Sequence, residues 1–341
     1  MKIKDVCSRF NSGRPIASNK ICDKGNFPVY GGNGIRGYTD NHNFDGECAV
    51  IGRQGAYCGN VKFFSGKAYM TEHAVVAVGN ENANTRFLAY KFGIMNFGRY
   101  ASQSAQPGLS VEMLASLPID LPPKETQDKI AALLGALDDK IALNKKINAT
   151  LEAMAKTIYM QEFFHKPPNG KLGDIIIENP KSTIPVGAAK STNGEFPFFT
   201  SGDSVLSRND SLVDGRNIFL NDGGNAGVKF YVGKAAYSTH TYSISTKENL
   251  VDYIYLLLKV IELELDKRFF TGTGLKNLRK DLLKERAIYI PTETERERFN
   301  SIVQPCFTKI SAKVRESRRL AELRDWLLPM LMNGQVDFKE R

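Results

Sequence analysis

A glycine-punctuated loop at residues 51–60 carries the side chains with the clearest chemistry. It holds Arg53, Gln54 and Tyr57 between two runs of β-forming residues. An arginine can pair with the edge of guanine, a glutamine with that of adenine, and a tyrosine can pack on a base or a sugar. The loop is therefore typical of a surface that reads nucleic acid, although each residue could instead cap its own turn.

A second loop, residues 220–227, repeats the glycine-rich frame with other side chains. It carries Asn221 and Asn225 in place of the arginine, glutamine and tyrosine of the first loop. Two loops that share a frame but differ in polar side chains predict two readers of two different short base sequences.

The basic charge of the chain is shared by both halves. The formal net charge is +9, of which residues 1–170 contribute +5 and the remainder +4. Phosphate contacts supply most of the sequence-independent affinity for nucleic acid, so a polyanion contacted by both halves fits this distribution. Double-stranded DNA is the partner that we expect, and a solvated basic surface is the alternative.

Further polar and basic side chains lie on neighbouring loops of each half. The candidate DNA-binding residues are Asn33, Arg36, Arg53, Gln54, Tyr57, Lys62, Gln103 and Gln106 in the first half, and Arg208, Asn221, Asn225, Lys229 and Lys276 in the second. Ser102, Ser104, Ser201, Asp203, Thr271 and Thr273 lie beside them on the same loops.

Motifs of familiar catalysts are absent. The chain has no GxxxxGK[ST] phosphate loop, no GxGxxG between a strand and a helix, no HExxH and no GxSxG. It also lacks the Asn-Pro-Pro-Tyr or Asp-Pro-Pro-Tyr tetrapeptide with which amino-methyltransferases hold the target amine. We therefore predict a binding protein that is not an enzyme and holds no metal and no cofactor of its own.

The cysteine pattern and the hydropathy indicate the cellular compartment of the protein. The five cysteines show no CxxC spacing, which favours free thiols in a reducing cytoplasm. No apolar run approaches the roughly 18 residues of a membrane helix, and no apolar stretch follows the first lysines, so we expect no signal peptide. His73 and His240 have no matched catalytic partner, and a structural role is expected for both.

The sequence segments that flank these loops occur twice in the chain. Residues 3–6 recur as 172–175, which is 169 positions later. The best-preserved stretch, residues 61–68, recurs at 228–235 with an offset of 167. A period this long exceeds the units of roughly 20–50 residues that build solenoids, so it indicates a duplicated domain with pseudo-two-fold symmetry.

Each half ends in a long helix with a heptad seam. Prolines before residue 124 and after residue 166 mark the limits of the first helix, whose length corresponds to a rod of roughly 60 Å. Apolar spacings of four and three predict a coiled-coil seam. The seam residues are Ile130, Leu134, Leu137, Ile141, Asn144, Asn148, Leu151, Ala155 and Ile158, then Phe299, Val303, Cys306, Ile310, Lys313, Ser317, Leu320, Arg324 and Leu327, with Leu323, Leu328 and Leu331 widening the second face.

These patterns predict an α+β fold with two similar mixed α/β recognition domains separated by two long antiparallel helices. The predicted limits are residues 1–123, 124–166, 167–290 and 291–341 for the first domain, first helix, second domain and second helix. Asn144 and Asn148 fall mid-seam, where buried polar residues can set register at a cost in stability. The alternative is that they face solvent at a local opening of the pair.

Several segments resemble the specificity (S) subunit of Type I restriction–modification systems, and the resemblance covers essentially the whole chain. Its most specific parts are LPPKETQDKI at residues 121–130, LDDKI at 137–141 and NKKINATLEAM at 144–154. IKDV at the start and QPGLS at residues 106–110 are also typical. The second half departs from the pattern at IPTE, which precedes a more basic and less regular helix.

The resemblance implies two target-recognition domains, each of which reads half of a split DNA site. It implies that the seam residues of the long helices form a spacer and a docking platform for two adenine-methyltransferase (M) subunits, which restriction (R) subunits with motor and nuclease activity then join. S-adenosylmethionine, ATP and Mg²⁺ would belong to those partners. A tandem DNA-binding adaptor of another defence complex and an enzyme that modifies DNA alone are the alternatives.

Overall fold

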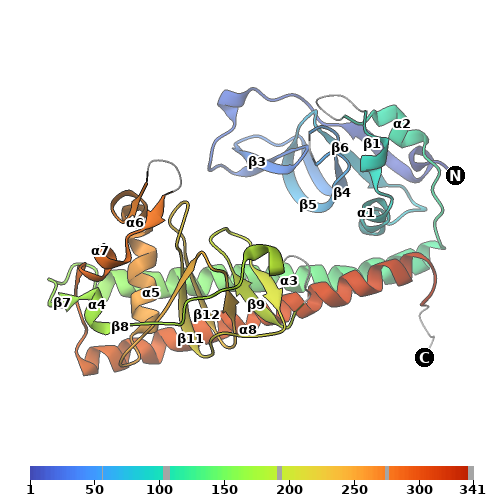
Figure 1. The fold of residues 1–341 in the computed structure, drawn as a ribbon. Coiled ribbons are helices and arrows are strands. Elements are labelled where there is room, and N and C mark those ends of the chain that lie inside the picture. The colour runs from blue at the N-terminus through green and yellow to red at the C-terminus, as the bar shows by residue number, and fades with distance from the viewer. Residues whose placement is uncertain (56, 103–107, 190–193, 273–275, 337–341) are drawn as a thin grey trace. The chain divides into compact units, whose positions relative to one another are not determined.

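The computed structural model describes residues 1–55, 57–102, 108–189, 194–272 and 276–336. The chain divides into two compact units. The first comprises Met1–Ile141 with Arg319–Arg341, and the second comprises Ala142–Arg318. Each unit therefore contains one globular part together with part of both long helices (Figure 1).

The first unit is built on a six-stranded sheet with the order β1-β6-β4-β5-β2-β3. Its neighbours pair antiparallel except β2 and β5, which are parallel. In the centre of the sheet, the last five residues of β4 and the first four residues of β6 are buried, and these stretches contain no charged side chain. The strands are β1 (Cys7–Ser12), β2 (Phe27–Gly31), β3 (Gly34–Thr39), β4 (Phe44–Gly52), β5 (Val61–Met70) and β6 (Ala74–Gly79).

In the second unit, the strands equivalent to those of the first unit form two sheets, ordered β12-β11-β14-β8 and β10-β9-β13. Its strands are β8 (Ile176–Glu178), β9 (Phe196–Phe199), β10 (Leu206–Arg208), β11 (Arg216–Asn221), β12 (Val228–Val232), β13 (Ala236–Tyr237) and β14 (Thr241–Thr246). Short strand pairs are formed by β7 (Gly170–Lys171) with β17 (Ala287–Ile288), and by β15 (Phe270–Thr271) with β16 (Asn277–Leu278).

Strand register confirms the internal duplication residue by residue. Ala49 pairs with Phe63 between β4 and β5, and Ile218 pairs with Phe230 between β11 and β12, at offsets of 169 and 167. The parallel pairing of β2 with β5 recurs between β9 and β13 at the same two offsets. The second unit therefore repeats the first, with the strand equivalent to β5 interrupted into β12 and β13.

Short helices cover the sheets and close the cores. In α1, Asn84 accepts a hydrogen bond from the amide of Phe87 at 2.9 Å, which satisfies one free donor at the helix start. Its equivalent, α5, is buried over eight consecutive residues. The short helices are η1 (Ile3–Val6), η2 (Ser18–Lys20), α1 (Thr85–Ile94), η3 (Phe97–Tyr100), α2 (Val111–Ser116), α4 (Leu172–Ile175), η4 (Val186–Ala189), α5 (Val251–Val260), α6 (Glu262–Arg268) and α7 (Lys280–Lys284).

The two long helices are α3 (Lys124–Glu162) and α8 (Glu293–Met332). Both are shorter than expected: α3 ends four residues before the predicted limit at residue 166, and α8 ends at Met332 rather than near residue 341. A capping box begins α8, because the Thr292 amide donates to Glu295 Oε2 at 2.8 Å and the Glu295 amide donates to Thr292 Oγ1 at 3.4 Å.

Within the first unit, α3 and α8 pair in opposite directions. Ile130 and Leu134 are buried in one cluster with Leu331, and Arg324 forms an ion pair with Asp138 at 2.6 Å. The remaining seam residues of this unit, Leu137, Ile141, Leu320 and Leu327, are half-buried. Leu323 was expected to widen the apolar face, but its side chain is 43% exposed, so that expectation was wrong.

Within the second unit the helices again run side by side in opposite directions (Figure 1). Phe163 packs edge to face on Phe299 with the ring centroids 5.3 Å apart, and Ala155 lies in the same core as Phe307. Asn144 is fully buried, which excludes the alternative that it faces solvent. Asn148, Leu151 and Ile310 are half-buried members of the seam.

Candidate nucleic-acid interface

In the first unit, three loop segments meet. The loop after β4 forms an isolated bridge between Gln54 and Gly108, and the Leu109 amide donates to the Arg53 carbonyl oxygen at 2.9 Å. The β2–β3 hairpin lies against the same loop so closely that a Cβ on Gly52 would come within 1.9 Å of the Gly32 carbonyl oxygen. The fold thus brings together candidates that are far apart in the sequence.

Most first-half candidates present exposed side chains on these segments. Asn33 and Lys62 line one small pocket together with the glycines of the hairpin. Within the part of the chain that the structure describes, neither Arg36 nor Lys62 forms an ion pair or a side-chain hydrogen bond. The exposed candidates are Asn33, Arg36, Gln54, Tyr57 and Lys62. These groups are therefore available to phosphates or base edges.

Arg53 differs from its neighbours because its side chain is partly engaged. Its Nε donates to the Leu109 carbonyl oxygen at 3.2 Å, and its Nη1 donates to Ser12 Oγ at 3.2 Å. The residue is half-buried and joins its loop to the end of β1 and to the segment after residue 108. A base contact by Arg53 stays a prediction. Gln103 and Gln106 lie outside the described residues.

The second unit repeats this three-segment frame position by position. Gly223 bridges Asn277, and the Leu278 amide donates to the Asp222 carbonyl oxygen at 3.1 Å, each 169 positions after its counterpart. The Arg53 amide donates to the His73 carbonyl oxygen at 3.0 Å, and the amide of the equivalent Asp222 donates to the His240 carbonyl oxygen at 2.9 Å. Both histidines thus support the frame through their backbone.

Two polar side chains of the second frame, those of Asn221 and Lys229, turn inward. Asn221 is buried, donates to the Asn225 carbonyl oxygen at 2.9 Å and accepts from Lys229 Nζ at 3.0 Å. Lys229 also donates to the Thr200 carbonyl oxygen at 2.7 Å, and burial lowers the pKa of its ammonium group. Asn221 and Lys229 therefore act as loop-capping residues in this structure, and their contact with DNA stays a prediction.

The other second-half candidates are divided between exposed and paired positions. Arg208 forms an ion pair with Asp210 at 2.7 Å, and Lys276 forms one with Asp266 at 3.0 Å. Asn225 is exposed at its loop. Both ion pairs leave part of the cation accessible, because Arg208 and Lys276 side chains remain 21% and 42% exposed.

Three features of this interface escaped sequence reasoning. Ile35 and Val205 are exposed at 53% and 48% on the two hairpins, where thymine methyl groups could pack on them. Arg53 of the first repeat is replaced in the second repeat by Asp222, which forms an ion pair with Lys280 Nζ at 2.8 Å. The repeat offset of 169 is enough to find this change from a positive to a negative side chain. The exposure of Ile35 and Val205 is known only from the structure.

The described residues contain no group of three His, Cys, Asp or Glu side chains that could hold a metal ion, and no described helix is long and apolar enough to cross a membrane. The five cysteines are free thiols. Burial raises the pKa of the Cys48 thiol to about 12, so this thiol is not a nucleophile at neutral pH.

Comparison with known proteins explains the repeated frame. Residues 1–153 and 169–316 each match the family described as the Type I restriction modification DNA specificity domain. The chain belongs to this family. Its two domain matches coincide with the two sequence repeats, so the specificity domain is the unit that has been duplicated.

Among curated relatives, the chain is 42% identical to the specificity subunit of the Type I restriction enzyme EcoprrI from Escherichia coli over 134 residues, which are 38% of this chain and 33% of that protein. The chain thus spans about a third of that relative's length. It is 23% identical to a putative type I specificity subunit of Mycoplasma pneumoniae over 90% of this chain and 88% of the relative.

The fold is shared with a solved specificity subunit. The crystal structure of the S subunit of a Type I restriction–modification system from M. genitalium matches with a TM-score of 0.65 at 16% identity, covering 99% of this chain and 96% of that one. This likeness confirms the expected class of fold, a duplicated mixed α/β specificity domain with long helices.

Proposed function

We propose that this chain is the DNA-reading, non-catalytic specificity subunit of a Type I restriction–modification system. The observation that carries the proposal is the recurrence of one three-segment frame in both units, with Arg53 in one and Asp222 in the other at the equivalent position. Two frames with different side chains read two different half-sites of a split double-stranded DNA target. Membership of the specificity-domain family supports this reading.

Binding combines phosphate contacts with base readout. Exposed cations such as Arg36 and Lys62 hold the backbone, and the loop side chains around them contact base edges in a groove. The net charge of +9, shared between the two repeats, favours a polyanion that both frames contact. This binding would take place in the cytoplasm.

Methyl transfer and cleavage belong to partner subunits in this proposal. Two methyltransferase subunits dock on the long helices and restriction subunits join through them, so S-adenosylmethionine, ATP and Mg²⁺ are held by the partners. Ile130 and Leu134 cannot form the docking surface, because they are buried within the helix pair of the first unit. Apolar residues exposed on the long helices are available instead: Leu133, Leu323 and Trp326 in the first unit, and Leu143, Met154, Ile302 and Val314 in the second.

The test is the adenine methylome of a methylation-free host that receives this chain and its cognate methyltransferase. A split motif with a fixed unread gap, which appears only when both genes are present, is the expected result. Methylation that is unchanged when this gene is omitted would contradict the proposal and indicate an adaptor. Methylation by this chain alone would identify it as an enzyme.

A further inference from the structure

An arginine of the first unit clamps the globular part onto α3. Arg86 of α1 donates through Nη2 to the Gly135 carbonyl oxygen at 3.0 Å. Its two terminal nitrogens also bind the two carboxylate oxygens of Asp139 at 2.8 and 2.7 Å. The guanidinium lies 4.8 Å from the ring centre of Phe63, so packing and hydrogen bonds hold it in one geometry.

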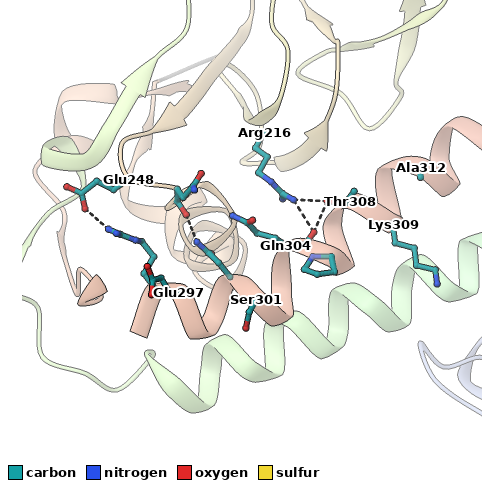
Figure 2. Close-up of a pocket in the computed structure, with 12 residues that line it drawn as sticks. Arg216, Glu248, Glu297, Ser301, Gln304, Thr308, Lys309 and Ala312 are labelled. Atoms are coloured by element: carbon teal, nitrogen blue, oxygen red, sulfur yellow. Dashed lines mark hydrogen bonds and ion pairs between the residues drawn. The ribbon is translucent and has the colours of Figure 1, made fainter. Parts of the chain in front are cut away.

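An arginine of the second unit makes the corresponding contacts on α8. Arg216 of β11 donates through Nη2 to the Gln304 carbonyl oxygen at 3.1 Å and to Thr308 Oγ1 at 2.7 Å. Its Nη1 donates to Asp252 of α5 at 2.6 Å. Figure 2 shows the guanidinium pointing from its strand onto the turn of α8 that carries Gln304 and Thr308.

The contacted helix positions are equivalent, but the arginines are not. Gln304 and Thr308 stand 169 positions after Gly135 and Asp139, the same offset as the repeat. Arg216 is instead the counterpart of Glu47, because the pairing of Glu47 with Ser65 becomes that of Arg216 with Val232.

The position of Arg86, second in the ten-residue α1, is occupied in α5 by Asp252. One clamp has thus been built twice on the same helix positions, from a helix in the first repeat and from a strand in the second.

Arg86 can lie close to the backbone of α3 because Gly135 has no side chain. A Cβ on Gly135 would lie 2.6 Å from the Arg86 Cζ, so any other residue at this position would force the guanidinium out of its observed place. The second repeat has a glutamine at this position, and its arginine arrives from β11 instead.

We propose that Arg86 and Arg216 are positioning residues that fix the angle of each recognition frame on its long helix, and thereby hold the unread gap of the target at a single length. The inference rests on the proposed function. Neighbouring base pairs are separated by about 3.4 Å, so a frame that tilts by a few ångströms would reach bases one step away. Bidentate guanidinium bonds are directional and suited to this task.

The test is the methylome described above, collected for Arg86→Gln and Arg216→Gln. Each variant should keep the bases of both half-sites but methylate sites whose gap is one base pair longer or shorter at least tenfold more than the wild type does. Lys67→Gln and Lys171→Gln remove exposed ion pairs from the same units and are the matched controls, with one gap length expected. Arg86→Lys replaces the first variant if Arg86→Gln does not fold.

A triple variant distinguishes a positioning role of the arginines from a purely stabilising one. Glu47→Arg, Arg86→Asp and Asp139→Thr together copy the clamp of the second repeat into the first and should restore a single gap length. A strictly single gap in both glutamine variants, with lower melting temperatures than the wild type, would overturn the inference and leave the arginines as stabilising residues. Loss of the split motif in the wild type would instead refute the proposed function.

Discussion

Lys313 donates from Nζ to Asn144 Oδ1 at 2.9 Å, and the two residues occupy the same position of the two repeats, 169 apart. Two equivalent positions can meet only near a local two-fold axis between the antiparallel helices. Asn144 also donates to Ser317 Oγ at 3.2 Å, and Ser317 is the equivalent of Asn148. The middle of the seam is therefore a polar layer, which penalises other registers of the helix pair.

Removing the acceptor of this layer should destabilise the protein. Asn144→Leu leaves the Lys313 ammonium without its Asn144 partner at a side chain only 15% exposed, at a cost of about 1–3 kcal/mol in the free energy of unfolding. Asn144→Leu with Lys313→Met should recover or exceed wild-type stability, since two apolar groups replace the polar pair. Urea unfolding midpoints measure both, and a double variant no more stable than the single one would contradict this account.

Gly135→Ala should be destabilising although alanine is the better helix former. The new Cβ would collide with Arg86 and displace it from Asp139, which outweighs the gain of up to about 1 kcal/mol that alanine normally brings. Gly93→Ala in α1 is the control, because its Cβ would meet nothing within 4 Å and should raise stability. Melting temperatures that rise equally in both variants would show that Arg86 moves aside at no cost.

Stability should depend on the protonation of Asp252. Burial raises the pKa of this carboxyl to about 6 despite the Arg216 ion pair, and among the described residues its Oδ2 has no hydrogen-bond partner. The pKa in the unfolded chain is about 3.9, so the folded state binds the proton more tightly and gains stability as pH falls from 7 to 5.

The comparison with Asp252→Asn isolates this effect. Relative to that variant, the wild type should gain roughly 1 kcal/mol of unfolding free energy between pH 7 and pH 5. Parallel pH dependence of the two proteins in chemical unfolding would show that Asp252 keeps an ordinary pKa.

Lys62 and Lys229 occupy equivalent positions but should respond differently to mutation. Lys62→Ala should weaken DNA binding and reduce the salt dependence of binding by about one ion, with little change in stability, because the ammonium is exposed. Lys229→Ala should cost about 1–3 kcal/mol in unfolding free energy, since the Thr200 carbonyl oxygen and the Asn221 side chain lose their donor. Affinity titrations across salt concentrations and urea unfolding distinguish the two, and matching profiles would contradict the assignment.

Arg53→Ala should relax or abolish recognition of the first half-site and leave the second intact. Ser12→Ala removes one of the contacts by which Arg53 holds its loop and adds no group that could read a base. The methylome of each variant separates base reading from loop support. Equal loss at both half-sites in Arg53→Ala would refute the assignment, and an equal effect of Ser12→Ala would assign Arg53 to loop support.

The division between loop side chains that are exposed and those that form hydrogen bonds within their own loops was not visible in the sequence. Asn221 and Lys229 looked as accessible as Asn33 and Lys62, yet they form hydrogen bonds inside their own frame. Glycine-rich loops place polar side chains next to backbone groups, and whether such a side chain turns inward depends on carbonyls supplied by a distant segment. For Lys229 that carbonyl belongs to Thr200, at the end of another strand.

For the seam of the long helices, in contrast, the local sequence was sufficient to predict which side chains face the partner helix. The spacing of Ile130, Leu134 and Asn144 along one helix face already determines which side chains meet the partner helix, because helical periodicity alone sets the face. These three residues are buried in the structure, whereas the end of α3 at Glu162 and the exposure of Leu323 were not predicted from the local pattern.

The sequence by itself determined that the protein is a duplicated domain with two long helices, since repeats and heptads are properties of order along the chain, and the resemblance of several segments indicated the specificity-subunit family. Only the tertiary structure decided that Arg86 and Arg216 clamp equivalent turns from different elements, and that Asn144 meets its own counterpart. Such contacts join segments that are 49, 88 and 169 residues apart in the sequence, and packing sets the distances between those segments.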